Sequence, residues 1–354
     1  MRNVSVFLLT YGHFEYTKVA LDCLIENRDS SRLTELIILD TLPAPWNQDE
    51  TQEQLEQIQQ RGYGDFSPHN IKVIFLDKNY GSPWTIKKGI ESCNSQNDVF
   101  FCSNDVFLGH NWLEPLVEVA YKDDWHTQYV ACVSPFQSPE YEWDEFINAE
   151  FRKQYIDGLY RYMIHEKDSS KILAGLHQLY EGNFVEFSKR FVQRNKGKVW
   201  DDLNYCCFLL KRDILDKGMF WDDRYSLLHD GGTTGYGSDD HDFSIQLDNA
   251  GYFRLTAFES FAHHLICGTN RKITLDDPEK NRKDIQSGNR FFMKWERDYT
   301  LPEIVYPFDL APGIPRAHHK HRWKLRETPL PNNIDVYKVD LGVGREILNC
   351  RIND

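Results

Sequence analysis

The stretch NDVFFCSNDVF, residues 97–107, decides the fold expected for this chain. It opens with a run of about five apolar and aromatic residues without helical spacing, which predicts a buried strand. Ser103, Asn104 and Asp105 then fall at the carboxyl end of that strand, where open α/β sheets place their ligands. A carboxylate beside small polar residues can hold a hard divalent cation and leave positions for phosphate oxygens. Asp105 is therefore predicted as a metal ligand, and a plain strand-ending turn is the alternative.

Strands and helices are expected to alternate on both sides of this stretch. The strands are predicted at residues 4–9, 36–39, 71–76 and 129–133, and the helices at residues 15–26, 48–61, 82–93 and 112–121. Repeated strand-helix units at this spacing predict a mostly parallel sheet with helices on both faces. The fold class is therefore α/β, and residues 1–135 are expected to form a nucleotide-binding half.

The pattern changes after residue 135. Residues 136–204 contain aromatic-rich segments with helical faces and few β-branched residues, which predicts a helical insertion. Residues 205–270 return to strand and helix patterns and are expected to form the second half of the same domain. Residues 271–354 are polar and broken by prolines, which predicts an irregular C-terminal extension. Its last ~20 residues suggest one edge strand.

Carboxylates gather behind a run of flexible turn residues, residues 230–237. Asp239, Asp240 and Asp242 follow at the amino end of an amphipathic helix, where the helix dipole and the free amides favour negative charge. Helix capping alone accounts for one carboxylate at this position, but it accounts less well for three of them so close together. Further on, His263 and His264 stand in an apolar segment, where a buried core histidine and a metal ligand are both open interpretations.

Two segments of this acidic chain are basic. Residues 188–198 hold five Lys or Arg residues without an acid among them, and residues 316–326 form a second basic segment. A solvated surface is the simpler interpretation, and contact with phosphate groups is the alternative. If both segments lined an acceptor entrance, the acceptor would be anionic, with a modified nucleic acid as the leading candidate.

Composition and charge narrow the class of protein. The 354 residues are 41% hydrophobic, which is ample for a globular core. With 54 acidic and 41 basic residues the formal charge is −13, which disfavours non-specific attraction to nucleic acid or anionic membranes. Eight cysteines show neither a zinc pattern nor a dense disulfide framework. We expect no transmembrane segment and no signal peptide, and hence a cytoplasmic protein.

The order of these features resembles the family 2 glycosyltransferases of GT-A fold, over residues 4–269. In the first half the resemblance rests on the opening strand and loop, the strand ending at Asp40, the Asn79-Tyr80-Gly81 segment, and the strand ending at Asp105. In the second half it rests on CCFLLKR at residues 206–212, GMFWDDRY at residues 218–225, GSDDHDF at residues 237–243, and AGY at residues 250–252.

The resemblance implies a metal-dependent, inverting transfer of a sugar from a nucleotide-diphosphate sugar, a UDP-sugar above all, to an acceptor hydroxyl. Asp240 is then the catalytic base, and Asp239 and Asp242 orient the acceptor or anchor the loop. The metal, Mn²⁺ or Mg²⁺, is held by Asp105 with His263 or His264. The residues that the resemblance assigns to the donor are Thr10, Tyr11, Asp40, Asn79, Gly81, Lys87 and Asn104.

This chain departs from the family pattern at two positions of the donor side. Ser103 replaces the first acid or amide of the metal motif, and Lys87 stands where Asn is common. Two alternatives stay open at this point: a nucleotidyltransferase of similar fold, and a non-catalytic protein that binds sugar nucleotides. The acceptor is equally open, and a glycan or a modified nucleic acid are both candidates.

Overall fold

The structure is a computed structural model of the 354 residues. It describes residues 2–28, 31–41, 48–122, 127–139, 147–200, 203–226, 238–265, 291, 294–297, 323–325, 334–340 and 346–352. The basic segment at residues 316–326 lies outside the described residues apart from 323–325, as does the turn-rich run at residues 230–237.

A mixed sheet of nine strands forms the centre of the described structure, in the order β3-β2-β1-β4-β8-β6-β9-β5, with β7 paired to β9. Its strands are β1 (Val4–Thr10), β2 (Leu33–Asp40), β3 (Ile71–Phe75), β4 (Asp98–Ser103), β5 (Val106–Leu108), β6 (Val130–Ser138), β7 (Val199–Trp200), β8 (Cys207–Leu210) and β9 (Phe253–His264). Strands β1 to β4 pair in parallel, and so do β6 and β9, whereas β5, β7 and β8 run antiparallel to their neighbours. The mostly parallel α/β sheet expected from the sequence is therefore confirmed.

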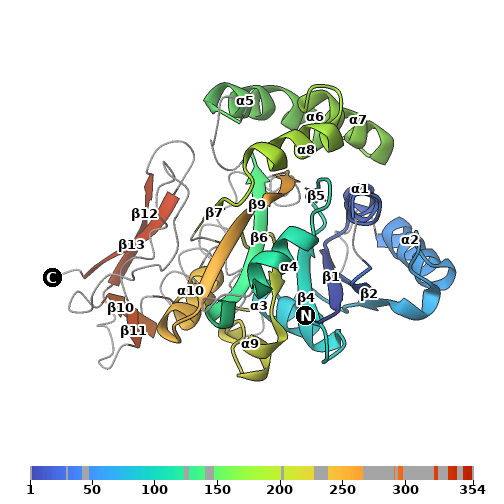
Figure 1. Ribbon diagram of the computed structural model, residues 1–354. Coiled ribbons are helices and arrows are strands. Elements are labelled where there is room, and N and C mark those ends of the chain that lie inside the picture. The colour runs from blue at the N-terminus through green and yellow to red at the C-terminus, as the bar shows by residue number, and fades with distance from the viewer. Residues whose placement is uncertain are drawn as a thin grey trace.

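Helices cover both faces of this sheet (Figure 1). Helices α1 (Phe14–Glu26), α2 (Gln48–Arg61) and α4 (Glu114–Tyr121) bury their apolar side chains against one face. Helices α3 (Ser82–Ser92), α9 (Arg212–Asp216) and α10 (Ser238–Asn249) cover the other. Strand β4 needs no polar alternation because both of its faces are buried, which is the reason for its continuous apolar sequence.

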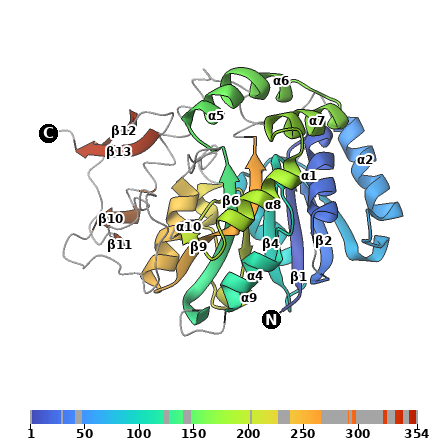
Figure 2. The same ribbon diagram turned by 45° about the horizontal axis from the view of Figure 1, so that its top comes forward.

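A group of helices between β6 and β7 packs at the end of the sheet where β5 and β9 lie (Figures 1 and 2). It consists of α5 (Ala149–Gln154), a π-helical turn (Tyr155–Leu159), α6 (Tyr160–Met163), α7 (Ser169–Leu179) and α8 (Phe184–Arg194). The side chains of Asn148, Asp168 and Asn183 cap three of these helices by accepting backbone N–H groups. Their aromatic faces form one core with α1 and the tip of β9.

The C-terminal part contributes four short strands on the side of the molecule away from α1 and α2 (Figures 1 and 2). Strand β10 (Trp295–Arg297) pairs antiparallel with β11 (Trp323–Leu325), and β11 packs against α10. Strand β12 (Ile334–Asp340) pairs antiparallel with β13 (Glu346–Ile352). The expectation of one edge strand at the end of the chain is therefore wrong, because two strands there satisfy each other's backbone hydrogen bonds.

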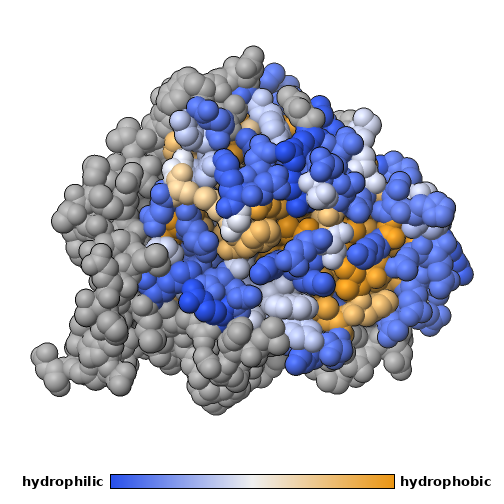
Figure 3. All heavy atoms as spheres, turned by 90° about the horizontal axis from the view of Figure 1, so that it is seen from below, coloured by the Kyte–Doolittle hydropathy of each residue, from blue (hydrophilic) through white to orange (hydrophobic). Residues whose placement is uncertain are grey.

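The described surface is mostly hydrophilic on the face shown in Figure 3. Hydrophilic residues there surround smaller areas of apolar residues. Among the described residues the large hydrophobic side chains that are exposed are Phe75, Tyr129 and Tyr162. No helix in the described part of the chain is long and apolar enough to cross a membrane.

Candidate active site

Three parallel strands bring the predicted donor residues to one edge of the sheet. Thr10 and Asp40 end β1 and β2 opposite each other, and the Oγ1 hydroxyl of Thr10 donates to Oδ1 of Asp40 over 2.6 Å. Burial raises the pKa of Asp40, and the Thr10 hydrogen bond opposes that rise. Oδ2 of Asp40 is buried and has no hydrogen-bond partner among the described residues. This edge therefore offers an acceptor atom for the N–H groups of a bound base.

Asn104 links the central strand to the loop after β1. Its backbone N–H donates to the carbonyl of Leu9 over 3.0 Å. Its Nδ2 group donates to the carbonyl of Gly12 at 3.2 Å and to the Oγ1 of Thr17 at 3.1 Å. The amide thus holds the loop that begins α1, and only its Oδ1 atom remains suited to a donor contact. Tyr11 lies in this loop, and burial raises the pKa of its phenol.

The segment before α3 completes this side of the site. Oδ1 of Asn79 accepts the backbone N–H of Gly81 over 2.9 Å, and Gly81 precedes α3 with φ at +87°. Glycine is suited to that position because a Cβ disfavours positive φ. Lys87, one turn into α3, places its Nζ 3.8 Å from a carboxylate oxygen of Asp223. This contact joins the donor side to the 3₁₀ turn Asp223–Tyr225.

Asp105 and His264 lie together at the end of the central strand. In the antiparallel pairing of β5 with β9, Val106 stands opposite His264, so the residue before Val106 lies beside this histidine. Oδ2 of Asp105 is 3.6 Å from Nε2 of His264, and both side chains are about nine-tenths buried. Within the described ranges no group of three or more His, Cys, Asp or Glu side chains is arranged to hold a metal ion. A cation here needs further ligands from substrate and water.

His263 points into the aromatic core formed with the inserted helices. Its Nδ1 is hydrogen-bonded to the Tyr180 hydroxyl at 2.8 Å, and the ring of Tyr155 stands edge-on at 5.0 Å. Burial lowers the pKa of His263 to about 3, so this imidazole is neutral at physiological pH. The structure thus brings His264, and not His263, to Asp105. Neighbouring residues of a strand face opposite sides of the sheet, which accounts for the difference.

The first turn of α10 carries Asp239 and Asp240. Burial raises the pKa of Asp240 to about 6, and contact with the Trp221 side chain opposes that rise. Burial and the charge of Asp240 raise the pKa of Asp239 well above its usual range. Trp221 itself stacks on Phe243 of α10 with ring centroids 3.9 Å apart. A carboxyl group that titrates near neutral pH can act as a general base.

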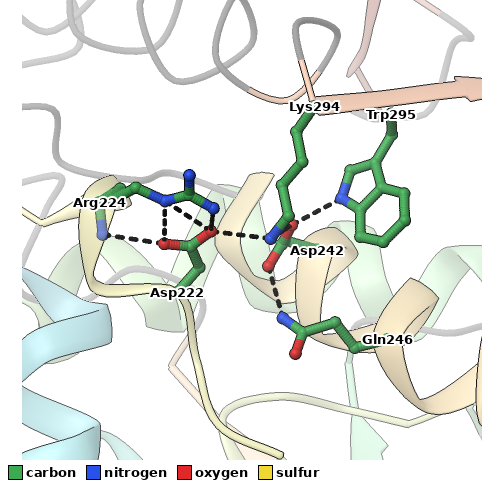
Figure 4. A network of polar contacts seen from close by, with 6 residues as sticks. All are labelled: Asp222, Arg224, Asp242, Gln246, Lys294 and Trp295. Atoms are coloured by element: carbon green, nitrogen blue, oxygen red, sulfur yellow. Dashed lines mark hydrogen bonds and ion pairs between the residues drawn. The ribbon is translucent and has the colours of Figure 1, made fainter. Parts of the chain in front are cut away.

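Asp242 lies in a network that binds it to other parts of the protein (Figure 4). It is fully buried, and its Oδ1 accepts from Nε1 of Trp295 and from Nζ of Lys294, each at 2.6 Å. Its Oδ2 accepts from the amide of Gln246 at 2.7 Å. Asp242 was expected either to orient the acceptor or to anchor the loop. These contacts agree with an anchoring role, and they account for the position of Asp242 without an acceptor.

The model for glycosyl transferase family 2 matches residues 5–218, more than half of the chain. The chain belongs to this family. It is a glycosyltransferase, and the GT-A fold expected from the sequence is confirmed. None of the curated proteins compared with the chain matches it.

Solved structures resemble this glycosyltransferase at low sequence identity. GalNAc-T7 with UDP, GalNAc and Mn²⁺ matches at 13% identity and a TM-score of 0.47, over 75% of this chain and 44% of GalNAc-T7. The mannosyltransferase PcManGT from Pyrobaculum calidifontis, with GDP-Man and Mn²⁺, matches at 13% identity and a TM-score of 0.44, over 82% of this chain and 70% of its own. S. aureus TarS 1–349 matches at 13% identity and a TM-score of 0.41, over 82% of this chain and 72% of TarS 1–349. This chain therefore spans less than half the length of GalNAc-T7.

Asp222 lies in the run GMFWDDRY, residues 218–225, which carries part of the family resemblance, but no individual role was expected for it. Burial opposes the charged form of Asp222, but hydrogen bonds from Arg224 and Lys294 outweigh it and hold its pKa well below the usual range. Tyr225, fully buried, lies close enough to Asp242 and Asp222 for their charges to raise its pKa further than burial alone. The run WDDRY at residues 221–225 was the available signal, because four ionisable groups follow a tryptophan there.

Two of the five basic residues of the segment 188–198 are paired with acids of the insertion. Lys189 pairs with Glu186 at 2.7 Å, and Arg190 pairs with Glu181. Lys198 donates to the side chain of Asn195 at 2.9 Å. These partners favour the solvated-surface interpretation over phosphate contact for residues 188–198.

Proposed function

We propose that this family 2 glycosyltransferase transfers a sugar from a nucleotide-diphosphate sugar, a UDP-sugar in the first instance, to an acceptor hydroxyl with inversion at the anomeric carbon. The observation that carries the proposal is the placement of Thr10, Asp40 and Asp105 at the ends of three adjacent strands, within the matched family region. Family membership supports sugar transfer over the nucleotidyltransferase and the non-catalytic alternatives.

The residues at the end of β4 fit a divalent cation. Two ligands of an octahedral ion at ~2.1 Å and at right angles lie about 3 Å apart, and Asp105 and His264 need little movement from 3.6 Å to reach that spacing. One carboxylate and one imidazole leave coordination positions for diphosphate oxygens and water. Asp105 and His264 would hold Mn²⁺ or Mg²⁺ there, and the cation would act as a Lewis acid on the departing diphosphate.

Asp240 is proposed as the general base. As the acceptor oxygen forms its bond to the anomeric carbon, the bond from that carbon to the diphosphate oxygen breaks, and the acceptor proton passes to the carboxylate of Asp240. With a pKa near 6 this carboxylate is ionised at pH 7, and on proton transfer it becomes a neutral acid in a partly buried setting. The same burial that raises its pKa therefore favours the proton transfer.

The donor side is proposed to use the remaining residues. Asp40 would accept from the base, with Thr10 and Tyr11 beside it, and Asn104 would contribute its Oδ1 atom. The segment from Asn79 to Gly81 would border the sugar, and Lys87 would lie near the diphosphate. We propose no acceptor role for Asp242, and Asp239 stays the acceptor-orienting candidate.

A donor screen tests this proposal. Purified full-length protein is incubated with a panel of UDP- and GDP-sugars, and nucleotide release is measured with Mn²⁺, Mg²⁺ or EDTA. One UDP-sugar should be turned over in the presence of either metal, and glycan acceptors should raise the rate. Release of pyrophosphate from a nucleoside triphosphate and a sugar phosphate would instead identify a nucleotidyltransferase.

A modified nucleic acid is the second acceptor candidate, and it depends on residues 316–326. Titration of duplex DNA by gel shift at several salt concentrations, with wild type and with the variant Arg322→Glu/Lys324→Glu, addresses it. An affinity that falls steeply with salt and is weaker in the variant supports a nucleic acid acceptor. No binding by the wild type at low salt, or equal binding by both proteins, removes it in favour of a glycan.

A further inference from the structure

One lysine from the C-terminal part of the chain bridges two carboxylates at the start of α10 (Figure 4). Nζ of Lys294 lies 2.6 Å from Oδ1 of Asp242 and 2.7 Å from Oδ2 of Asp222. The Asp242 side chain is fully buried, and those of Asp222 and Lys294 are 11% and 17% exposed. Trp295, next in sequence, donates its indole N–H to the same Oδ1 of Asp242.

These contacts join three separate segments of the chain. Asp222 precedes the 3₁₀ turn Asp223–Tyr225, Asp242 belongs to the first half of α10, and Lys294 and Trp295 stand just before and within β10. Lys294 is 72 residues from Asp222, and Trp295 is 53 residues from Asp242. Both lie beyond residue 218, where the family match ends. We call this set, Asp222, Asp242, Lys294 and Trp295, the α10 clamp.

Most of the charged side chains around the first turn of α10 are acidic, and the nearby cations other than Lys294 have partners of their own. Arg224 lies on the outer side, 63% exposed, and its hydrogen bonds go to Asp222. Lys87 of α3 lies near Asp223, and Arg254 of β9 is paired with Asp248. Among the described residues, the ionisable side chains on or near the turn include Asp239, Asp240, His241 and Asp242 of α10, Asp222, Asp223, Arg224 and Tyr225 before it, Tyr205 before β8, and Lys294.

We propose that Lys294 and Trp295 are positioning residues for sugar transfer, which couple the C-terminal extension to the helical turn that carries Asp240. This inference rests on the proposed role of Asp240 as general base. Without Lys294, Asp242 is a buried carboxylate without its cation, a costly state that is relieved only if the turn moves or Asp242 takes up a proton. Movement of the turn displaces Asp240, which lies two residues from Asp242, and protonation of Asp242 changes the charge beside it.

The coupling affects turnover more than donor binding. The donor candidates lie at the ends of β1 and β2, in the loops after β1, after β4 and before α3, and on α3 itself, whereas the polar contacts of Lys294 go to Asp222 and Asp242. A displacement of the base by about 1 Å can reduce turnover by about 100-fold. For Lys294→Met we therefore expect kcat to fall about 10- to 100-fold, with KM for the nucleotide sugar nearly unchanged.

The experiment compares Lys294→Met with Lys294→Arg and with Lys189→Met in the full-length protein. Lys189→Met makes the same chemical change at an exposed ion pair on α8, and it should behave as wild type. Lys294→Arg keeps the cation and should recover most of kcat. All measurements are made at a temperature where circular dichroism shows each variant to be folded, so that a loss of folded protein is not counted as a loss of kcat.

A second measurement does not depend on activity. The unfolding free energy of wild type, Lys294→Met, Asp240→Asn and the double variant is followed from pH 5 to 8. The wild-type inflection assigned to Asp240 should move to higher pH in Lys294→Met and be absent from both variants that lack Asp240. If no donor is turned over but this shift is seen, the clamp stands and the assigned reaction fails. Unchanged kcat, or an unmoved inflection in an active enzyme, overturns the clamp.

Discussion

Replacing Asp240 by Asn removes the proposed base and changes little else in shape. A positioned general base contributes about 10²- to 10⁴-fold, and we expect a loss of transfer in that range with donor binding nearly intact. In the wild type, activity should fall about tenfold per unit as the pH drops below about 6, the pKa of Asp240, because only its ionised form accepts a proton.

The same substitution should stabilise the fold. A carboxyl group whose pKa rises on folding stabilises the folded state when protonated, and that contribution is fully present below its pKa in the unfolded chain. It is lost as the pH rises through the folded value. The rise from 3.8 to about 6 corresponds to at most about 3 kcal/mol, and partial exposure of Asp240 reduces it to about 1–2 kcal/mol. The Asn variant avoids this loss, so its advantage should emerge between pH 4 and 7.

Two assays measure these effects. Nucleotide release and product formation, measured from pH 5 to 8, show how the transfer rate falls on the acid side of the pH–rate profile. Urea denaturation at the same pH values gives the unfolding free energy. The reasoning is refuted if Asp240→Asn transfers sugar at the wild-type rate, or if Asp239→Asn abolishes transfer while Asp240→Asn does not. An Asn variant that is no more stable than wild type at pH 8 would show that Asp240 is not desolvated.

The remaining predictions concern the metal and donor residues. Asp105→Ala should abolish metal-dependent turnover without unfolding the protein, and full wild-type activity in EDTA would contradict a metal role. His264→Asn should raise the Mn²⁺ concentration required for half-maximal rate, whereas His263→Gln should lower thermal stability and leave that concentration unchanged; the reverse pattern would exchange the two histidines. Thr10→Val removes a hydrogen bond to the Asp40 carboxylate, which is worth roughly 1.5–3 kcal/mol. Initial rates should show KM for the nucleotide sugar raised about tenfold, with kcat retained. An unchanged KM would show that the nucleotide base of the donor does not bind at Asp40.

The sequence by itself determined the elements and the strand ends of this glycosyltransferase. Apolar runs and helical spacing are local properties, so the alternation of strands and helices through residues 4–133 was readable from residue types. Asp105 was expected at the end of the central strand from its own sequence, and the family resemblance assigned Thr10 and Asp40 to the donor; the structure places all three at adjacent strand ends. Their roles in donor and metal binding stay predictions.

Only the tertiary structure decided how the remaining candidates divide. His263 and His264 are equivalent in the sequence, but the register of β9 against β5 puts one beside Asp105 and the other among the aromatic rings of the insertion. Asp242 was grouped with Asp239 and Asp240, yet Lys294 and Trp295 both contact its Oδ1 atom. Those partners come from more than 50 residues away, where no local pattern marks them. The local sequence pattern predicts which side chains a helix or strand carries. The register of the strands and contacts between distant segments decide which of those side chains contact each other.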